Sequence, residues 1–185
     1  MRLLPVTVAF VIASLGATPT HAQVPTPTGG TVPAADAADV ESIDAILGAL
    51  YDVISGPAGQ SRDWDRFRSL FAAEAKLSPT GIPQGSSTVR ARFTPVEDYV
   101  EGSGSLIEER GFYESEIGRV TEQFGAIAHA FSTYQSQWTP DGDVFQRGVN
   151  SIQLLWDNER WWIMSIMWWG VGPDEEIPAR YLGHR

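Results

Sequence analysis

FQRGVNSIQLLWDNERWWIMSIMWWG, residues 145–170, is the stretch that decides the fold of this chain. Two runs of β-branched, aromatic and long apolar residues, 149–156 and 161–169, flank the polar tetrad 157–160, and this pattern predicts a β-hairpin. Five of the seven Trp lie in it, and each large aromatic side chain buries on the order of 150 to 250 Å². The hairpin is therefore expected to form the centre of the hydrophobic core.

Both faces of the predicted hairpin are mostly apolar. A two-residue turn at Asn158 and Glu159 predicts one shared face, made of Ser151, Gln153, Leu155, Trp162, Met164 and Ile166. An antiparallel sheet with one wet face alternates apolar and polar residues, so the run WWIMSIMWW indicates that both faces are covered. The helices of the chain can cover one face. A second copy is expected on the other, which predicts a homodimer through the outer face of the sheet.

The N-terminal residues have the pattern of a secretory signal peptide. A charged start, the apolar run 3–17 and the small-residue pattern Thr20-His21-Ala22 predict that residues 1–22 are removed. Residues 23–38 are rich in Pro, Gly, Thr and Ala, which predicts a flexible linker. We therefore expect a periplasmic or secreted protein.

The composition narrows the range of partners and cofactors. The 185 residues carry a formal net charge of −10, which repels nucleic acid and anionic membrane surfaces, so neither is expected as a partner. No cysteine is present, which excludes a disulfide framework. Phosphate-loop, dinucleotide-binding and zinc-protease motifs are absent from the sequence, so we expect no cofactor and no metal.

Helical periodicity comes first along the chain. Apolar residues at i, i+3 and i+4 predict helices from Asp39 to Gly56 and from Asp63 to Phe71. A short strand at 75–77 and a loop over 78–87 are expected to follow. The sequence Thr94-Pro95-Val96-Glu97 then predicts a third helix, with an N-cap threonine and a capping-box glutamate.

Strand periodicity follows from Phe112 onward. Alternation with a period of two predicts four long strands, at about 112–124, 126–138, 144–156 and 161–169. Gly118 and Gly148 sit in the middle of two of them, where a bulge or bend is expected. Helices followed by a curved antiparallel meander indicate an α+β domain over residues 39–170, with a tail at 171–185.

This order of elements resembles the nuclear transport factor 2 superfamily, in particular its SnoaL-like bacterial branch. The most specific pieces are the motif from Asp63-Trp64 to Phe71-Ala72 and the charged turn Asn158-Glu159-Arg160 followed by Trp161-Trp162-Ile163. The resemblance covers about residues 39–170. It implies helices packed on a strongly bent sheet that forms a cone with an internal pocket, often in a dimer.

The enzymes that this resemblance suggests each require polar groups in the cone. The isomerase type has a carboxylate after the short strand, but Leu77-Ser78-Pro79-Thr80 occupies that place. The dehydratase type has two histidines, whereas only His129 lies in a predicted strand of the mature domain. The resemblance thus leaves one enzyme hypothesis, in which His129 is a general base assisted by Tyr134 or Gln153.

Binding of a small, largely apolar molecule in the cone is the leading functional hypothesis. The alternatives are an isomerase, dehydratase or cyclase type of enzyme that uses His129 and Tyr134, and a structural dimeric module of the envelope. The residues expected to line the pocket are Tyr51, Trp64, Phe67, Tyr99, Phe131, Asn150, Ser151, Gln153, Trp162 and Trp168. The acidic strand residues Glu114, Glu116 and Glu122, with Arg119, are expected to form a solvated edge of the sheet.

Overall fold

The computed structural model describes residues 22–183, so the predicted signal peptide lies outside the described residues except for Ala22. The helices are α1 (Ala37–Val40), α2 (Ile43–Ile54), α3 (Trp64–Ser69), α4 (Val96–Arg110) and the 3-10 turn η1 (Ala179–Tyr181). The strands are β1 (Gln23–Pro25), β2 (Thr31–Pro33), β3 (Phe71–Gly81), β4 (Arg90–Ala91), β5 (Thr94–Pro95), β6 (Tyr113–Phe124), β7 (Ile127–Gln137), β8 (Val144–Trp156) and β9 (Trp161–Val171). None of the described helices is long and apolar enough to cross a membrane.

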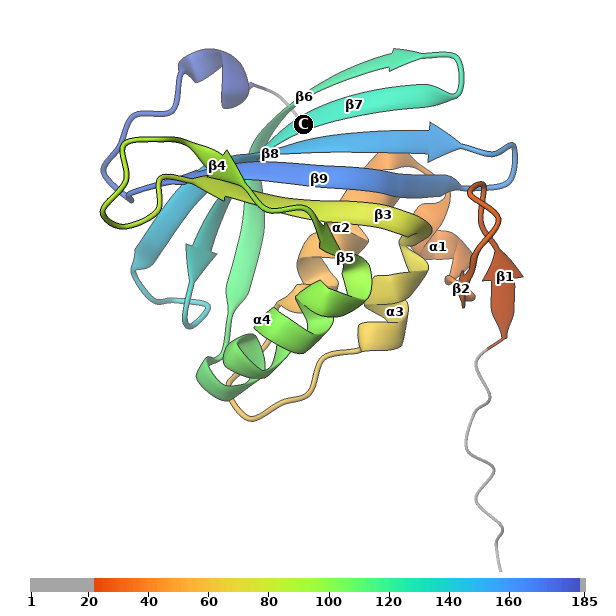
Figure 1. Cartoon of the computed structure of the whole chain (residues 1–185), viewed down its shortest axis with the longest axis horizontal. Helices are drawn as coiled ribbons and strands as arrows, with labels where there is room; N and C mark the ends of the chain where they lie inside the picture. The colour runs from red at the N-terminus through yellow and green to blue at the C-terminus, as the bar shows by residue number, and fades with distance from the viewer. Residues whose placement is uncertain (1–21, 184–185) are drawn as a thin grey trace, which may run out of the picture.

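One seven-stranded sheet organises the molecule. Its strand order is β4-β3-β9-β8-β7-β6, with β5 paired to β3. Strands β6 to β9 form an antiparallel meander, whereas β3 runs parallel to β9. The sheet curls around α2, α3 and α4, which all lie on its concave side (Figure 1). The predicted α+β class, with helices on a strongly bent sheet, is confirmed.

The hairpin at 145–170 forms as predicted, with Trp156 opposite Trp161. The Asp157 carboxylate closes the turn by accepting two backbone N–H bonds, at 2.8 and 2.9 Å. Asn158 takes the positive φ (80°) that such a tight turn requires and that Asn tolerates better than most residues. The local sequence is thus sufficient to place this turn.

The register predicted for this hairpin is correct near the turn and wrong beyond it. Leu155 lies opposite Trp162, but Gln153 lies opposite Ser165, because the register shifts between the two pairs. A shift of one residue exchanges the two faces of a strand. Ile166 therefore packs towards the helices with 5% exposure, whereas Gln153 is exposed on the outer face.

The helix starts differ from the predicted ones because side chains find other partners. The first predicted helix is two helices, since Ser42 caps α2 by accepting a bond from the Ala45 N–H at 3.0 Å. The predicted capping box at 94–97 is absent: Pro95 caps α4 without a side-chain bond. Glu97 instead pairs with Arg68 of α3 at 2.6 Å, so the acidic residue ties two helices together.

The loop predicted at 78–87 is in part a strand. β3 continues to Gly81 because it pairs with β9 from Phe71 to Thr80. The Thr80 hydroxyl also donates a hydrogen bond to the Trp168 carbonyl. A neighbouring strand thus outweighs the turn-forming tendency of the Pro79 region.

The two mid-strand glycines make room for other parts of the chain. Gly118 lies at a bulge, as predicted, and a Cβ there would come within 2.7 Å of the Leu182 backbone. Gly148 lies at no register shift, so it makes no bulge. A Cβ at Gly148 would come within 2.5 Å of the Tyr134 hydroxyl oxygen, so this glycine admits the Tyr134 side chain.

The segment predicted as a flexible linker, residues 23–38, is packed against the domain. β1 and β2 pair as an antiparallel hairpin, and Val32 is only 8% exposed. The hairpin lies beside α3 and the start of β3, where a Cβ at Gly30 would collide with the Ala73 side chain. The linker prediction is therefore wrong, because tertiary contact orders a composition that is typical of loops.

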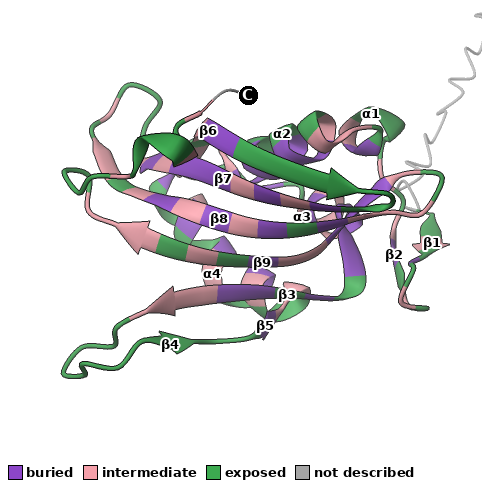
Figure 2. Cartoon of the chain, turned by 90° about the horizontal axis from the view of Figure 1, so that it is seen from above, coloured by how far each residue is buried: buried purple, intermediate pink, exposed green. Residues whose placement is uncertain are grey.

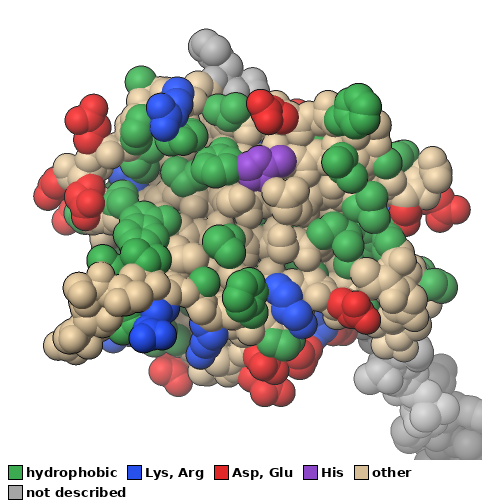
Figure 3. All heavy atoms as spheres, turned by 45° about the horizontal axis from the view of Figure 1, so that its top comes forward, with side chains coloured by type: hydrophobic (Ala, Val, Ile, Leu, Met, Phe, Trp, Pro, Cys, Tyr) green, Lys and Arg blue, Asp and Glu red, His purple; other side chains and the backbone are tan. Residues whose placement is uncertain are grey.

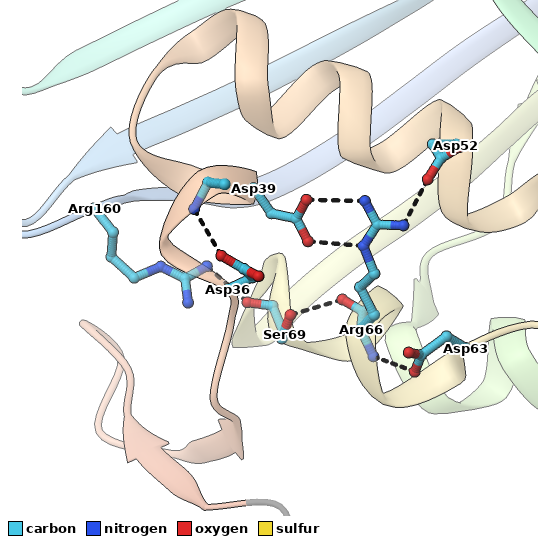
Figure 4. A network of polar contacts seen from close by, with 8 residues as sticks. Asp36, Asp39, Asp52, Asp63, Arg66, Ser69 and Arg160 are labelled. Carbon is cyan, nitrogen blue, oxygen red and sulfur yellow. Dashed lines mark hydrogen bonds and ion pairs between the residues drawn. The ribbon is translucent and has the colours of Figure 1, made fainter.

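Arg66 joins the N-terminal helices in a network of polar contacts (Figure 4). Its guanidinium binds both Asp39 oxygens, at 2.7 and 2.8 Å, and reaches Asp52 at 2.6 Å. Arg160 donates to the Ser69 carbonyl at 2.6 Å, which ties the hairpin turn to the end of α3. The pKa of Asp39 is lowered, mainly by its hydrogen bond to Arg66.

The outer face of the sheet carries no helix layer over most of its area, as the view from above shows (Figure 2). Met167 and Trp169 of β9 are 40% and 42% exposed. The C-terminal segment lies over part of β6 and β7, where Tyr181 stacks on Phe131 at 5.5 Å and accepts a bond from Thr133. The tail thus covers one part of this face and leaves the rest open.

Candidate functional site

A cavity of about 240 Å³ lies between the concave face of the sheet and the helices. Its lining is mostly aliphatic and aromatic: Leu50, Ile54, Phe67, Leu77, Tyr99, Ser103, Leu106, Ile107, Phe112, Glu114, Tyr134, Gln146, Asn150, Ile166 and Trp168. An apolar cavity of about 150 Å³ is enough to hold benzene. The cone therefore has room for one ring and a few further atoms.

Aromatic rings hold the shape of this cavity. Phe67 of α3 stacks on Tyr99 of α4 with ring centroids 5.6 Å apart, and Tyr99 meets Trp168 of β9 edge to face at 6.4 Å. Paired rings of this kind pack rigidly and are stabilised by about 0.5–1.5 kcal/mol beyond their area burial. The wall formed by α3, α4 and β9 is therefore preorganised.

Glu114 of β6 places a carboxyl group in this apolar wall. The Ser136 hydroxyl donates to its Oε2 at 2.9 Å, but no Arg, Lys or His among residues 22–183 forms an ion pair with it. Burial disfavours the charged form and raises the pKa of Glu114 to about 7. Glu114 can therefore exchange a proton near neutral pH.

Two tyrosines share the interior with Glu114. The hydroxyls of Tyr99 and Tyr134 make no hydrogen bond within the described residues. The pKa of each is raised, first by burial and then by the nearby Glu114 charge. Both therefore stay protonated and remain available as neutral hydrogen-bond partners for a bound molecule.

A polar chain runs from the cavity wall towards β6. The Asn150 amide donates to the Tyr51 hydroxyl at 3.0 Å, Tyr51 bonds to the Ser132 hydroxyl at 2.6 Å, and Ser132 donates to Glu116 at 2.6 Å. The single Ser132 proton points to Glu116, so Tyr51 must donate to Ser132. These hydrogen bonds therefore all donate in one direction, from Asn150 towards Glu116, and they fix the orientation of the Asn150 amide. The side-chain carbonyl oxygen of Asn150 takes no part in them.

Two larger hollows, of about 690 and 680 Å³, are open grooves on the surface beside α2 and β6. The second groove is lined by Asp44, Asp52, Glu114 and Glu116, with Arg119 as its only cationic side chain among the described residues. Glu114 lines both this groove and the cone cavity. The carboxyl group thus stands at the wall between the interior and an acidic surface.

The prediction that Glu114, Glu116, Glu122 and Arg119 form a solvated edge of the sheet is wrong for three of these four residues. Glu114 and Glu116 point to the concave face, and a register shift after Glu116 brings Arg119 to the same side. Arg119 is 8% exposed and pairs with Asp44 and Glu116. Of these four residues, only Glu122 is exposed, as expected.

Four of the predicted pocket residues line the cavity, namely Phe67, Tyr99, Asn150 and Trp168, and so does Tyr134, which was predicted to be catalytic. Tyr51 lies one step behind them, bonded to Asn150. Trp64 packs edge to face against Phe67 at 5.6 Å and donates to Glu108, so it supports the wall from outside. Trp162 is 1% exposed beside the hairpin turn, donates to Asp157 and lies under the Arg160 guanidinium, away from the cavity.

The remaining predicted residues lie on the outer face of the sheet. His129 bonds to Ser151 at 2.9 Å and meets Phe131 edge to face at 4.8 Å. Gln153 lies next to them, opposite His129. Figure 3 looks onto this face and shows the histidine in purple at the surface. Tyr134 projects from the other side of the same strand, so His129 and Tyr134 cannot act on one molecule in the cone.

The residues that sequence reasoning missed are Glu114 and Gln146. The alternation of Tyr113, Glu114, Ser115 and Glu116 shows that the two glutamates share a face, but it does not show which face. Only the pairing of β6 with β7 shows that Ser136 lies opposite Glu114 and that Tyr134 lies near it on the same face. In the described part of the chain, no group of three or more His, Asp or Glu side chains is placed to hold a metal ion.

Neither protein-family models nor curated protein sequences match this chain. Solved structures do match it. A protein of unknown function from Nostoc punctiforme with a cystatin-like fold aligns at a TM-score of 0.53 and 11% identity, covering 74% of this chain and 92% of the other. The β-subunit of a candidate aromatic-ring-hydroxylating dioxygenase from Novosphingobium aromaticivorans aligns at 0.53 and 14%, covering 77% and 94%.

The chain has a cystatin-like fold. This confirms the resemblance inferred from the sequence as far as the fold is concerned. A candidate scytalone dehydratase, also from Novosphingobium aromaticivorans, aligns at a TM-score of 0.51 and 11% identity, covering 74% of this chain and 87% of the other. The matching structures thus range from candidate enzymes to a protein of unknown function, so the site itself must indicate the function.

Proposed function

We propose that this chain binds a small, largely apolar molecule in its cone, with Glu114 as the polar anchor. The observation that carries the proposal is an aromatic-lined cavity of about 240 Å³ whose wall includes the Glu114 carboxyl group, which forms no ion pair with any described residue. Apolar pockets with a few convergent polar groups and a perturbed titratable residue are the usual form of small-molecule sites.

The test uses two serines of α4. Ser103 lines the cavity, whereas Ser105 on the same helix is exposed. Calorimetric titration with benzyl alcohol should show binding to the wild type, at least tenfold weaker binding to Ser103→Phe, and unchanged binding to Ser105→Phe. Equal binding by both variants, or no binding by the wild type, would contradict the proposal. Native mass spectrometry of the purified protein provides an independent search for a retained molecule.

A second candidate function is proton transfer, with Glu114 in place of His129 as the general base. The observation that favours it is a carboxyl group whose pKa lies at about 7, together with the free hydroxyls of Tyr99 and Tyr134. The Glu114 carboxylate would take a proton from a carbon beside a ketone. A tyrosine hydroxyl would stabilise the enolate oxygen, and the proton would then return to the carbon.

Deuterium exchange tests this second candidate without a known substrate. Cyclohexanone is incubated with the protein in deuterated water, and loss of its α-proton signals is followed by NMR. Catalysis by Glu114 should make exchange faster with the wild type, and Glu114→Gln should lower the rate enhancement by roughly 10² to 10⁴. An equal rate with His129→Gln is expected. Exchange no faster than in buffer would exclude this function for small ketones.

We further propose that the protein acts outside the cytoplasm after loss of residues 1–22. The support is the sequence pattern of the first 22 residues together with the packed hairpin that begins at Gln23. N-terminal sequencing of the periplasmic or secreted fraction should give Gln-Val-Pro. An intact Met1 species confined to the cytosol would overturn this proposal.

A further inference from the structure

The charge surroundings of Glu114 restrict what the cone can hold. The titratable groups that face its carboxyl group are Tyr51 on α2, Tyr99 on α4 and Tyr134 on β7, all of which are neutral. The next carboxylate on its own strand is Glu116, and no cationic side chain from the described part of the chain lines the cavity. An ionised Glu114 therefore lacks a counter-ion, and a bound cation could supply one.

The polar atoms around the cavity are rich in acceptors. Glu114 offers carboxylate oxygens, and the hydroxyl oxygens of Tyr99 and Tyr134 carry no hydrogen bond within the described residues. The Asn150 side-chain amide donates its N–H to the Tyr51 hydroxyl, so the side-chain carbonyl oxygen of Asn150 is left as a further acceptor. An ammonium group has three donors and no acceptor, so it matches this set.

The apolar lining also suits a cation with a hydrophobic body. Phe67, Tyr99 and Trp168 contribute ring surfaces to the wall, and the faces of aromatic rings attract ammonium groups electrostatically. Outside the wall, the groove that Glu114 also lines carries Asp44 and other carboxylates, and the whole chain has a net charge of −10. This field attracts cations to the site and repels anions.

We propose that the cone selects a small primary amine, with its ammonium group on the Glu114 carboxylate and its apolar body among Phe67, Tyr99 and Trp168. This inference rests on the proposed binding function and names its ligand class. A neutral molecule of the same shape would leave the ionised carboxylate without a partner and would bind less well above neutral pH.

The proposal has a pH signature with a fixed sign. A bound ammonium favours the ionised carboxylate, so it must displace the proton that the empty site holds below about pH 7. Amine affinity should therefore fall by up to about tenfold for each pH unit below 7. An uncharged ligand gains nothing from ionisation, so its affinity should stay level or weaken as the pH rises.

Benzylamine and benzyl alcohol form a matched pair of probes, since they differ in the charge of one group. Calorimetric titrations at pH 6 and pH 8 compare them on the full chain. We expect benzylamine to bind at least tenfold more tightly than benzyl alcohol at pH 8, and to lose about tenfold in affinity at pH 6. Glu114→Gln should abolish both the preference for benzylamine and its pH dependence.

Glu122→Gln is the matched control, because it removes the same charge from an exposed position on the same strand. It should retain the preference for benzylamine. If benzyl alcohol binds as well as benzylamine at pH 8, or if Glu122→Gln loses the preference as Glu114→Gln does, the amine inference is wrong and the binding function stands. If neither benzylamine nor benzyl alcohol binds, both the proposed binding function and the amine inference are wrong.

Discussion

Two carboxylates of this chain have opposite surroundings, and the contrast separates a structural role from a functional one. Asp39 lies against Arg66, which donates two hydrogen bonds to it and lowers its pKa. Among residues 22–183, Glu114 has a single hydroxyl donor and no cationic partner, and burial raises its pKa to about 7. The first carboxylate has its partner within the fold, whereas the second leaves room for one in a cavity.

The same contrast explains why only one of them is expected to limit stability. A buried ion that is paired in the fold stabilises it modestly, whereas an unpaired one destabilises it whenever it is charged. Sites for binding or catalysis commonly keep such an unfavourable group. Glu114 is therefore the residue whose removal should stabilise the fold, and Arg66 the residue whose removal should weaken it.

The largest expected change in the free energy of unfolding is that of Glu114→Gln at high pH. The folded pKa of about 7 lies above the ordinary value of 4.5, so the folded chain keeps a proton that the unfolded chain has already lost. The resulting stabilisation is complete below about pH 4.5, declines as the pH rises and is gone above about pH 7. One pKa unit corresponds to about 1.36 kcal/mol. At pH 8 the free energy of unfolding of the wild type should therefore be lower than that of Glu114→Gln by on the order of 3 kcal/mol.

Urea unfolding of both proteins at pH 5 and pH 8 measures this difference. The gap in the free energy of unfolding should be large at pH 8 and small at pH 5. Glu122→Gln, at an exposed site, should follow the wild type within about 0.5 kcal/mol at both pH values. A constant gap between wild type and Glu114→Gln would break the comparison, because it would mean that Glu114 ionises normally in the folded chain.

The second effect in size concerns Arg66→Met, which leaves Asp39 without its partner. We expect a loss of about 1–3 kcal/mol in the free energy of unfolding at pH 7. The lowered pKa of Asp39 means that this contribution is present above the ordinary value of 3.8 and is lost as the pH falls through the folded value below it. Chemical denaturation at pH 7 and pH 3 should therefore show a gap that narrows in acid.

Arg68→Met is the control for Arg66→Met, since Arg68 pairs with Glu97 and Asp65, whose side chains are 53% and 44% exposed. Ion pairs at exposed positions contribute about 0–1 kcal/mol. An equal loss from both variants would show that the Asp39 network is no stronger than a surface pair.

The outer face extends the comparison to a third titratable group. His129 has one hydrogen bond, to Ser151, and lies on the convex side of β7, away from the cone. His129→Gln should cost about 0.5–1 kcal/mol of stability and leave benzyl alcohol binding unchanged. A tenfold loss of affinity in a calorimetric titration would place His129 in the binding site and contradict the assignment of the two faces.

The smallest effect on stability is expected from Trp169→Glu on the same outer face. Trp169 is 42% exposed, so the free energy of unfolding per chain should change by about 0.5 kcal/mol or less. The variant is informative because it tests the oligomeric state. We expect the wild type to form a homodimer through this face and Trp169→Glu to be a monomer, as judged by the mass from light scattering at micromolar concentration. A monomeric wild type would mean that only the C-terminal tail, which lies over β6 and β7, covers the outer face of the sheet.

Much of the fold could be predicted from the sequence because its signals are local. The polar tetrad at 157–160 marks a turn, and long alternating runs mark strands whatever they pair with. The order of helices before strands limits the class to α+β, and the structure confirms it. The hairpin at 23–33 could not be predicted in this way, because its Pro- and Gly-rich strands are ordered only by contact with α3 and β3.

The candidate site depended on the side of the sheet that each residue faces, and only the tertiary structure decided this. The sequence by itself determined that Glu114 and Glu116 share one face of a strand and that His129 and Phe131 share one face of the next. Which face meets the helices follows from the pairing of β6 with β7 and from register shifts at two places in the sheet. Since a shift of one residue exchanges the two faces, the pairing placed Glu114 in the cone and His129 outside it.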